Sequence, residues 1–159
     1  MTVRTILTEP NKILRQVSQN VETVGNDERK LMDDMLDTMY AANGIGLAAI
    51  QIGIPKRIIV MDISKDEKKK EPRYFVNPVI KNKDPIKSTY EEGCLSVPDQ
   101  FAEIDRPSKC EVEYLDYNGE KKIIKSRRFI SNLYSAWDGS FRGNTLYWLF
   151  IKIKEIYDY

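Results

Sequence analysis

One strong helical pattern followed by strand patterns constrains the fold of this chain more than any other feature. Apolar side chains recur at the three- and four-residue spacing of a single helix face. They are Leu31, Met32, Met35, Leu36 and Met39. Asn26 or Asp27 is the predicted N-cap, and we expect the helix to end near Asn43-Gly44. A shorter helical spacing follows Pro10, with apolar positions at Ile13, Leu14 and Val17.

Beyond the helix, the signals are those of strands. The run Ile58–Met61 is apolar throughout, and Tyr74–Val76 is a second short candidate. A hairpin is predicted from Val112–Tyr117 to Lys121–Ile124, because Asn118-Gly119 lies between them and both residues tolerate positive φ. Helices followed by hairpin-linked strands predict an α+β fold rather than alternating βαβ units.

Length and charge exclude several classes of protein. At 159 residues with 42% hydrophobic residues, the chain is expected to form one domain. Its net charge of +1 gives no general attraction to nucleic acid or to a membrane surface. No export signal or membrane-spanning run is visible, so we expect a cytoplasmic protein. Cys94 and Cys110 are predicted to be separate thiols, and Lys65–Glu71 a solvated loop.

The first of two motifs runs from Gly44 to Gln51 and reads GIGLAAIQ. Glycines flank Ile45 on both sides, so the backbone can adopt positive φ and a ligand can approach it closely. A peptide could lie against this edge, and the Gln51 amide could donate to an oxygen that gains negative charge. The alternative interpretation is a helix C-cap followed by the entry to a strand.

The second motif runs from Glu91 to Pro98 and reads EEGCLSVP. Cys94 follows Gly93 in a predicted turn, where a thiolate could reach a metal ion and the Leu95 N–H could point at a substrate oxygen. A lone cysteine is more often a small buried hydrophobe. The occurrence of both motifs in one chain favours the functional interpretation of each.

GIGLAAIQIG and EGCLSVPDQ together resemble the first two motifs of the peptide deformylase family. The N-terminal ILTEPNKILRQVSQNVE and the strand RIIVMD extend the resemblance over about residues 4–125. It implies an α+β fold in which small antiparallel sheets surround a central helix carrying an HExxH motif. It also implies a deformylase-like domain over residues 1–125, followed by an aberrant segment over 126–159 in which that helix is altered or lost.

In that family, Fe²⁺ or Zn²⁺ is held by the motif cysteine and two histidines, and a glutamate activates the water that removes the formyl group. The substrates are N-formylmethionyl nascent peptides, which implies a place near the ribosome. The resemblance makes Cys94 the metal ligand, and Gln51 and the Leu95 N–H the oxyanion donors. It assigns substrate binding to Gly44, Ile45, Gly46, Glu92 and Gly93.

The third motif is absent, because the chain contains no histidine. One thiolate cannot replace a site of three protein ligands. Cys110 is predicted to face the core on the same side as Val112, and a carboxylate such as Glu92 would be an untested substitute ligand. We therefore expect iron or zinc not to be bound stably and deformylase activity to be absent.

A shifted reading frame explains residues 126–159. Permitted codons for this segment, read one base later, can spell AEDLSLTCIQH, a variable residue, MDHLEGILYI, a second variable residue and YLSKLKKYMI. The variable residues fall at Trp137 and Trp148, the only tryptophans in the chain. The normal TGG codon would make both residues glycine and give HGMDH, whereas TGA codons, decoded or repaired as tryptophan, would make them glutamate and aspartate and give HEMDH. Our hypothesis is a frame slip near Lys125-Ser126.

The alternative is a genuine tail that folds in its own way. Helical spacing supports it at Ile130, Leu133, Tyr134, Trp137 and Phe141. Asp138–Ser140 and Gly143-Asn144 oppose it, because these stretches break a helix.

Three functional hypotheses follow. The first is an inactive deformylase family member whose metal site is lost. The second is a binding module that keeps the peptide edge and captures N-formylmethionyl peptides without cleaving them. The third is a frame-shifted product with no selected role.

Overall fold

The computed structural model describes residues 2–64, 69–83 and 85–127 of the chain. Within these ranges, one α-helix and two 3₁₀ segments accompany seven strands. The elements are η1 Lys12–Arg15, α1 Asn26–Ala41, β1 Gly46–Ala48, η2 Ala49–Ile52, β2 Ile58–Met61, β3 Arg73–Lys83, β4 Lys87–Cys94, β5 Val97–Pro107, β6 Lys109–Leu115 and β7 Lys121–Arg127. The predicted α+β class is confirmed. The predicted fate of the central helix concerns residues outside the described ranges.

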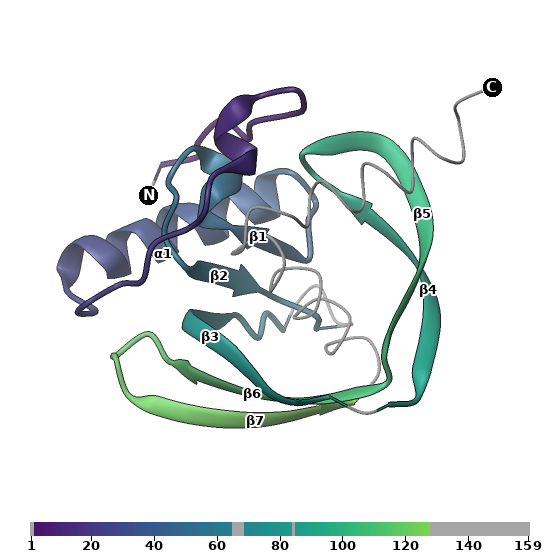
Figure 1. The fold of residues 1–159 in the computed structure, drawn as a ribbon. Coiled ribbons are helices and arrows are strands. Elements are labelled where there is room, and N and C mark those ends of the chain that lie inside the picture. The colour runs from purple at the N-terminus through teal and green to yellow at the C-terminus, as the bar shows by residue number, and fades with distance from the viewer. Residues whose placement is uncertain (1, 65–68, 84, 128–159) are drawn as a thin grey trace.

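Five strands form one antiparallel sheet in the order β1-β2-β3-β6-β7, and β4 pairs with β5 in a separate two-stranded ribbon. Figure 1 shows α1 against one side of the larger sheet and the β4–β5 ribbon curving past the sheet's end. β1 and β7 are the edge strands of the larger sheet. The first sequence motif therefore lies on a sheet edge, and the second lies at the closed end of the ribbon.

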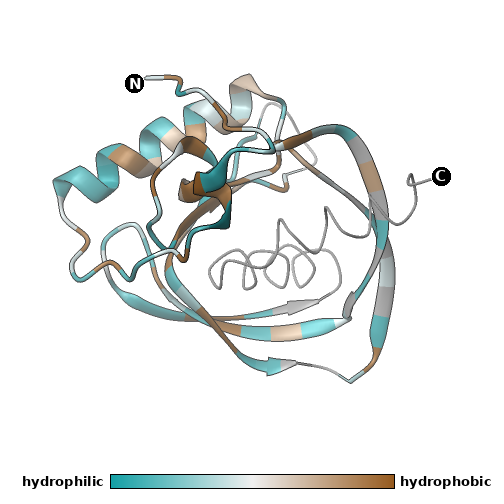
Figure 2. Ribbon diagram, turned by 45° about the horizontal axis from the view of Figure 1, so that its top comes forward, coloured by the Kyte–Doolittle hydropathy of each residue, from teal (hydrophilic) through white to brown (hydrophobic). Residues whose placement is uncertain are grey.

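Strand alternation divides the buried side chains into two clusters, one on each face of the sheet. The cluster shared with α1 contains Leu31, Met32, Met35, Met39, Leu47, Ile58, Val60 and Val76. The cluster on the opposite face contains Ala48, Ile59, Met61, Phe75, Cys110 and Val112. Figure 2 shows hydrophobic bands alternating with hydrophilic ones along α1, as expected for a helix buried on one side. Cys110 shares its cluster with Val112, as predicted.

Helix α1 lies where the sequence places it, but its cap differs from the prediction. Gly25, not Asn26 or Asp27, is the N-cap, and its N–H donates to the Glu28 carboxylate at 3.1 Å. A carboxylate in the first turn also suits the positive end of the helix dipole. The helix ends at Ala41, close to the predicted end.

The shorter helical prediction, after Pro10, is wrong in extent. Only the single turn η1 forms, in which Leu14 is buried while Val17 is 56% exposed. The chain becomes extended at Gln16, so the predicted face never completes a second turn. A local apolar spacing did not outweigh the packing of the segment across the sheet.

The β6–β7 hairpin is confirmed, but its turn is not the expected one. Of the pair Asn118-Gly119, only Gly119 has positive φ. The Asp116 carboxylate instead accepts hydrogen bonds from the N–H groups of Asn118 and Glu120, both at 2.9 Å. An aspartate side chain that mimics a backbone turn therefore closes this loop.

A bulge in β3 fixes the N-terminal segment to the sheet. It lies at Asn77-Pro78, where two residues oppose one on β6. Asn77 has φ 50, and its side-chain amide accepts from the Val21 N–H at 2.8 Å and donates to the Val21 carbonyl at 2.7 Å. The amide thus replaces a strand neighbour for Val21.

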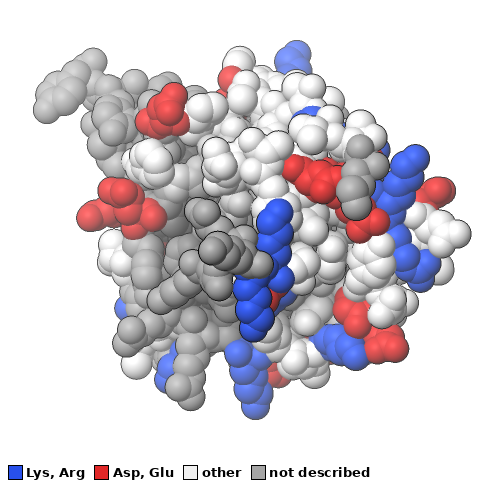
Figure 3. All heavy atoms as spheres, turned by 180° about the vertical axis from the view of Figure 1, so that it is seen from behind, with Lys and Arg blue, Asp and Glu red and all other residues white. Residues whose placement is uncertain are grey.

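The surface of the described residues mixes both signs of charge, as Figure 3 shows for one face. Opposite charges pair on β6 and β7, for example Lys121 with Glu113 at 3.2 Å. Exposed pairs of this kind contribute little stability. In the part of the chain that the structure describes, no helix combines the length and apolar character needed to span a membrane.

Candidate peptide and metal site

Gly44 joins the two sequence motifs by packing rather than by backbone freedom. Its φ is not positive, so that part of the prediction is wrong; the reversal after α1 occurs at Asn43, with φ 53. A Cβ at Gly44 would lie 2.7 Å from Cδ1 of Leu95 and 3.4 Å from the Met39 carbonyl oxygen. The absence of a side chain at Gly44 therefore lets Leu95 close over the start of the first motif.

The free side of edge strand β1 belongs to Gly46. The Ile45 carbonyl accepts a hydrogen bond from the Asp62 N–H at 3.0 Å. Because hydrogen bonding alternates along an antiparallel pair, the N–H and C=O of Gly46 point away from β2. Within the described residues this edge pairs with no other strand, and Ile45 is 44% exposed. An extended peptide could add here as a further strand.

Gln51 lies in η2 with its side chain buried and fully oriented. Its Oε1 accepts from the Ala48 N–H at 2.9 Å, which fixes which end of the amide carries the hydrogens. Its Nε2 lies 3.2 Å from Ser96 Oγ and 3.6 Å from Cys94 Sγ. The structure thus brings Gln51 and Cys94 together, as the resemblance implied.

Cys94 is the last residue of β4, half-buried opposite Val97. Burial raises the pKa of the Cys94 thiol, while the N–H groups of Ser96 and Val97 oppose that rise without cancelling it. The negative charge of Glu9 adds to the upward shift. With no cation beside it, Cys94 therefore remains a thiol at neutral pH, whereas a divalent cation would favour the thiolate.

The other predicted residues lie on the same end of the ribbon. Leu95 is in the turn between β4 and β5, and its half-buried side chain packs against the cluster shared with α1. Gly93 pairs with Phe101, and Glu92 pairs with Ala102. These positions border the region between the β1 edge and Cys94.

The described donor groups do not fit a catalytic iron or zinc ion. Across residues 2–64, 69–83 and 85–127, no three His, Cys, Asp or Glu side chains gather closely enough to hold a metal. Catalytic zinc sites use three protein ligands, and Cys94 supplies one. Cys110, the second thiol, is buried in the other cluster, and the two cysteines do not form a disulfide.

Two polar residues near the site were not predicted. Ser96 is fully buried beside Gln51, and Asp62 is buried after β2. The Asp62 carboxylate accepts from Tyr40 Oη at 2.6 Å and from the Glu71 N–H at 3.0 Å. Ser96 lies within the second motif and Asp62 directly follows the strand Ile58–Met61, and these positions are the sequence signal that could have identified them.

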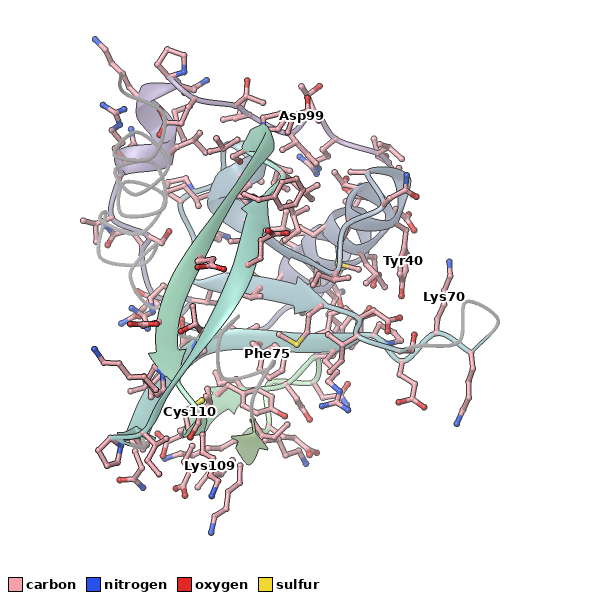
Figure 4. All side chains as sticks on the ribbon, turned by 90° about the vertical axis from the view of Figure 1, so that its right-hand side faces the viewer. Tyr40, Lys70, Phe75, Asp99, Lys109 and Cys110 are labelled. Atoms are coloured by element: carbon pink, nitrogen blue, oxygen red, sulfur yellow. The ribbon has the colours of Figure 1, made fainter. Side chains whose placement is uncertain are left out.

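Asp62 also anchors the surroundings of the peptide edge. Burial works against its ionisation, but the Tyr40 hydroxyl and nearby N–H groups hold the pKa of Asp62 below its usual range. Lys70 Nζ lies 3.9 Å from the centre of the Tyr40 ring. Figure 4 shows Tyr40 and Lys70 side by side, with Asp99 near the closed end of the ribbon. These contacts hold the end of α1 and the loop after β2 on either side of Ile45.

Comparison with known proteins decides the family. The family model for polypeptide deformylase matches residues 3–135. The chain belongs to the polypeptide deformylase family. Deformylases act on N-formyl nascent peptides and normally use a metal ion.

Individual deformylases agree with this assignment. The peptide deformylase of Pelagibacter ubique (strain HTCC1062) is 79% identical over 126 residues, which cover 79% of this chain and 73% of that protein. The peptide deformylase of Maricaulis maris (strain MCS10) is 56% identical over 121 residues, which cover 76% of this chain and 70% of that protein.

Solved deformylases share the fold. The crystal structure of the enzyme from Ehrlichia chaffeensis has a TM-score of 0.86 at 35% identity and covers 98% of this chain and 95% of its own. The class I type b deformylase from Acinetobacter baumannii, crystallised with bound Met-Ala-Ser, has a TM-score of 0.83 at 27% identity and covers 89% of this chain and 94% of its own.

Proposed function

We propose that this chain, as encoded, is a deformylase family protein that does not hydrolyse formyl peptides. The observation that carries the proposal is the donor set: Cys94 stands without a second and third ligand in the described residues, and the sequence contains no histidine. A single thiolate leaves a divalent ion free to exchange into solvent. The glutamate that serves as general base in the family has no counterpart in a matching motif.

The extent of the matches supports a frame slip as the cause. The family model stops at residue 135, just before Trp137, where the shifted frame places the glutamate of HExxH. The Pelagibacter ubique relative is 79% identical, yet the match covers only 126 residues. Gradual substitution would spread differences along the chain, whereas a frame slip leaves high identity on one side and none on the other.

The direct test is an assay of the purified chain after anaerobic loading with Fe²⁺ or Zn²⁺. We expect no release of formate from formyl-Met-Ala-Ser above the protein-free control, and no metal retained after desalting. Formate release that disappears in Cys94→Ala would overturn the proposal. The nucleotide sequence across codons 120–159 tests the cause, because the hypothesis requires the next frame to spell QHEMDHLEG.

A second function is supported by the peptide edge itself. The outward Gly46 backbone and the fixed Gln51 amide are available without a metal. They would hold an N-formylmethionyl peptide as an added strand, with the formyl oxygen accepting from Gln51. Isothermal titration with formyl-Met-Ala-Ser and with Met-Ala-Ser should show preference for the formylated peptide, and Gln51→Leu should remove that preference. Absence of any binding would eliminate this function.

The binding function would act on peptides that are still being synthesised. This supports a cytoplasmic location near the ribosome, since formylated N-termini belong to nascent chains. Sedimentation of the tagged chain with translating ribosomes, and its loss from that fraction after peptide release, is the expected result. Recovery of the tagged chain only in the slowly sedimenting fractions, apart from translating ribosomes, would contradict a location near the ribosome.

A further inference from the structure

Ser96 is a buried polar residue at the end of an otherwise exposed ribbon. Its exposed fraction is 0%, while Phe101 on the neighbouring strand is 57% exposed. Burying a hydroxyl is costly unless the group forms hydrogen bonds. The Ser96 hydroxyl accepts a hydrogen bond from the Gln51 amide, with Nε2 at 3.2 Å from Oγ, and it also hydrogen-bonds the Cys94 sulfur. The turn therefore buries this hydroxyl between Gln51 and Cys94.

The oxygen of the Gln51 side-chain amide already accepts a hydrogen bond. Oε1 accepts from the Ala48 N–H at 2.9 Å, so the amide cannot rotate by half a turn without placing its NH₂ against another donor. An NH₂ group carries two hydrogens. One is directed to Ser96 Oγ, which leaves the second for the side of Cys94, whose sulfur is 3.6 Å from Nε2.

The backbones of both partners are held by one N-terminal segment. The Leu7 N–H donates to the Gln51 carbonyl at 2.7 Å, and the Glu9 N–H donates to the Ser96 carbonyl at 3.0 Å. The side-chain bond between Gln51 and Ser96 thus joins two residues that are already fixed. Little further entropy is lost when it forms.

We propose that Ser96 is a positioning residue, which orients the Gln51 amide so that its second N–H is directed to the Cys94 side, where a ligand oxygen would accept it. Ser96 itself is not assigned any contact with the peptide. The identity of that oxygen, a formyl oxygen, rests on the proposed function. The orientation of Gln51 does not, so the two parts can be tested separately.

Ser18 provides a matched control for Ser96. It is also buried, at 4% exposed, but its hydroxyl finds no hydrogen-bond partner among the described residues. Ser96→Ala and Ser18→Ala therefore each delete one buried oxygen, and only the first deletes a bond to Gln51. Any effect shared by both variants reports the loss of a buried hydroxyl and not positioning.

The first readout is the side-chain amide of Gln51 in ¹⁵N-correlated NMR spectra of the full chain, without ligand. Ser96→Ala should shift both amide protons and increase their exchange with water, while Ser18→Ala leaves them in place. Unchanged Gln51 signals in Ser96→Ala would overturn the proposal. If Ser96→Ala does not fold, the wild-type chain still decides it, because positioning requires a nuclear Overhauser contact between the Gln51 amide and the Ser96 β-protons.

The second readout is affinity for formyl-Met-Ala-Ser relative to Met-Ala-Ser. Ser96→Ala should lower this preference by about fivefold to tenfold, the usual value of one hydrogen bond, with Ser18→Ala unchanged. Equal preference in both variants would overturn the proposed positioning. If the wild-type chain shows no preference, the binding function fails, and the NMR readout still decides the role of Ser96.

Discussion

The two motifs of this chain are supported by regions of different construction. The first motif is embedded in the main core, where Leu47 and Gln51 are buried between the sheet and its neighbours. The second lies at the end of the β4–β5 ribbon, whose strands pair only with each other among the described residues. The two regions meet where Leu95 covers Gly44 and where Ser96 contacts Gln51.

This difference separates binding from catalysis. The peptide edge and the Gln51 amide depend on α1, the sheet and the N-terminal segment, all within the described residues. Under the proposed function, a metal site would depend on Cys94 and on two histidines, and the sequence contains no histidine. On the proposed function, a change confined to the tail would abolish hydrolysis while the groups proposed to bind a peptide keep their local support.

The largest expected effect comes from restoring the reading frame. A chain in which residues from Ser126 onward are replaced by the shifted-frame translation, with HEMDH intact, should gain deformylase activity. Because the metal-bound water is the nucleophile in the family, we expect an increase of at least about 1,000-fold in formate release over the chain as encoded. The measurement is the initial rate with formyl-Met-Ala-Ser and bound Fe²⁺.

The restored chain also carries its own control. Cys94→Ala in that background should return the rate to that of the encoded chain, since the metal loses a ligand. A restored chain that binds metal and remains inactive would show that the first two motifs have also lost function, which contradicts the separation between binding and catalysis.

A smaller effect distinguishes the cores of the two regions. Met35 is fully buried between α1 and the sheet, so Met35→Ala should lower the free energy of unfolding by about 2–5 kcal/mol. Phe101 on the ribbon is 57% exposed, and Phe101→Ala should change it by less than about 1 kcal/mol. Urea unfolding followed by circular dichroism measures both. Equal losses would mean that the ribbon is as deeply packed as the main core.

The contact between the regions is tested at Gly44. Gly44→Ala should lower the free energy of unfolding by about 1–3 kcal/mol, because the new Cβ would lie 2.7 Å from Leu95 Cδ1 and force that side chain aside. In a Leu95→Ala background the same substitution should cost clearly less, since the clashing methyl group is gone. A double-mutant cycle in urea measures the coupling. Additive losses would show that Gly44 is constrained by the Met39 backbone instead.

The sequence predicted the structure correctly where an apolar pattern was compatible with only one buried arrangement. The spacing from Leu31 to Met39 permits one buried helix face, and Ile58–Met61 is buried throughout as expected of a central strand. The separate environments of Cys94 and Cys110 were predicted as well. In each case burial of apolar groups dominated and local alternatives were weak.

Prediction failed where side chains act through tertiary contacts. Apart from the exposed Phe101, most side chains along the β4–β5 ribbon are polar and show no strong alternation, so only its turn was recognised from the cysteine motif. Gly44 was attributed to backbone freedom, but the reason for it is Leu95, which is distant in sequence. The roles of Ser96 and Asp62 likewise depend on partners that no local pattern specifies. The assignments of Glu92, Gly93 and the Leu95 N–H to substrate contacts stay predictions.

The smallest effect concerns acid stability and is assigned to the α1 side of the molecule. The Arg4 guanidinium bonded to Asp34, with help from the Thr2 N–H, holds the pKa of Asp34 below its usual range against the effect of burial. A lowered pKa in the folded state means that the Asp34 carboxylate stabilises the fold above its unfolded pKa of about 3.9. That stability is lost as the pH falls through the folded value.

Asp34→Asn should therefore lower the free energy of unfolding by about 1–2 kcal/mol at pH 7, a value reduced by the partial exposure of Arg4. The difference from the wild-type chain should shrink as the pH falls below about 4, because protonation then removes the same charge from Asp34. Asp37→Asn on the same helix is the control, since Asp37 forms no ion pair within the described residues. Urea titrations from pH 7 to pH 3 measure the difference. A difference that persists unchanged at pH 3 would mean that the shape of Asp34, and not its charge, holds the N-terminal segment on α1.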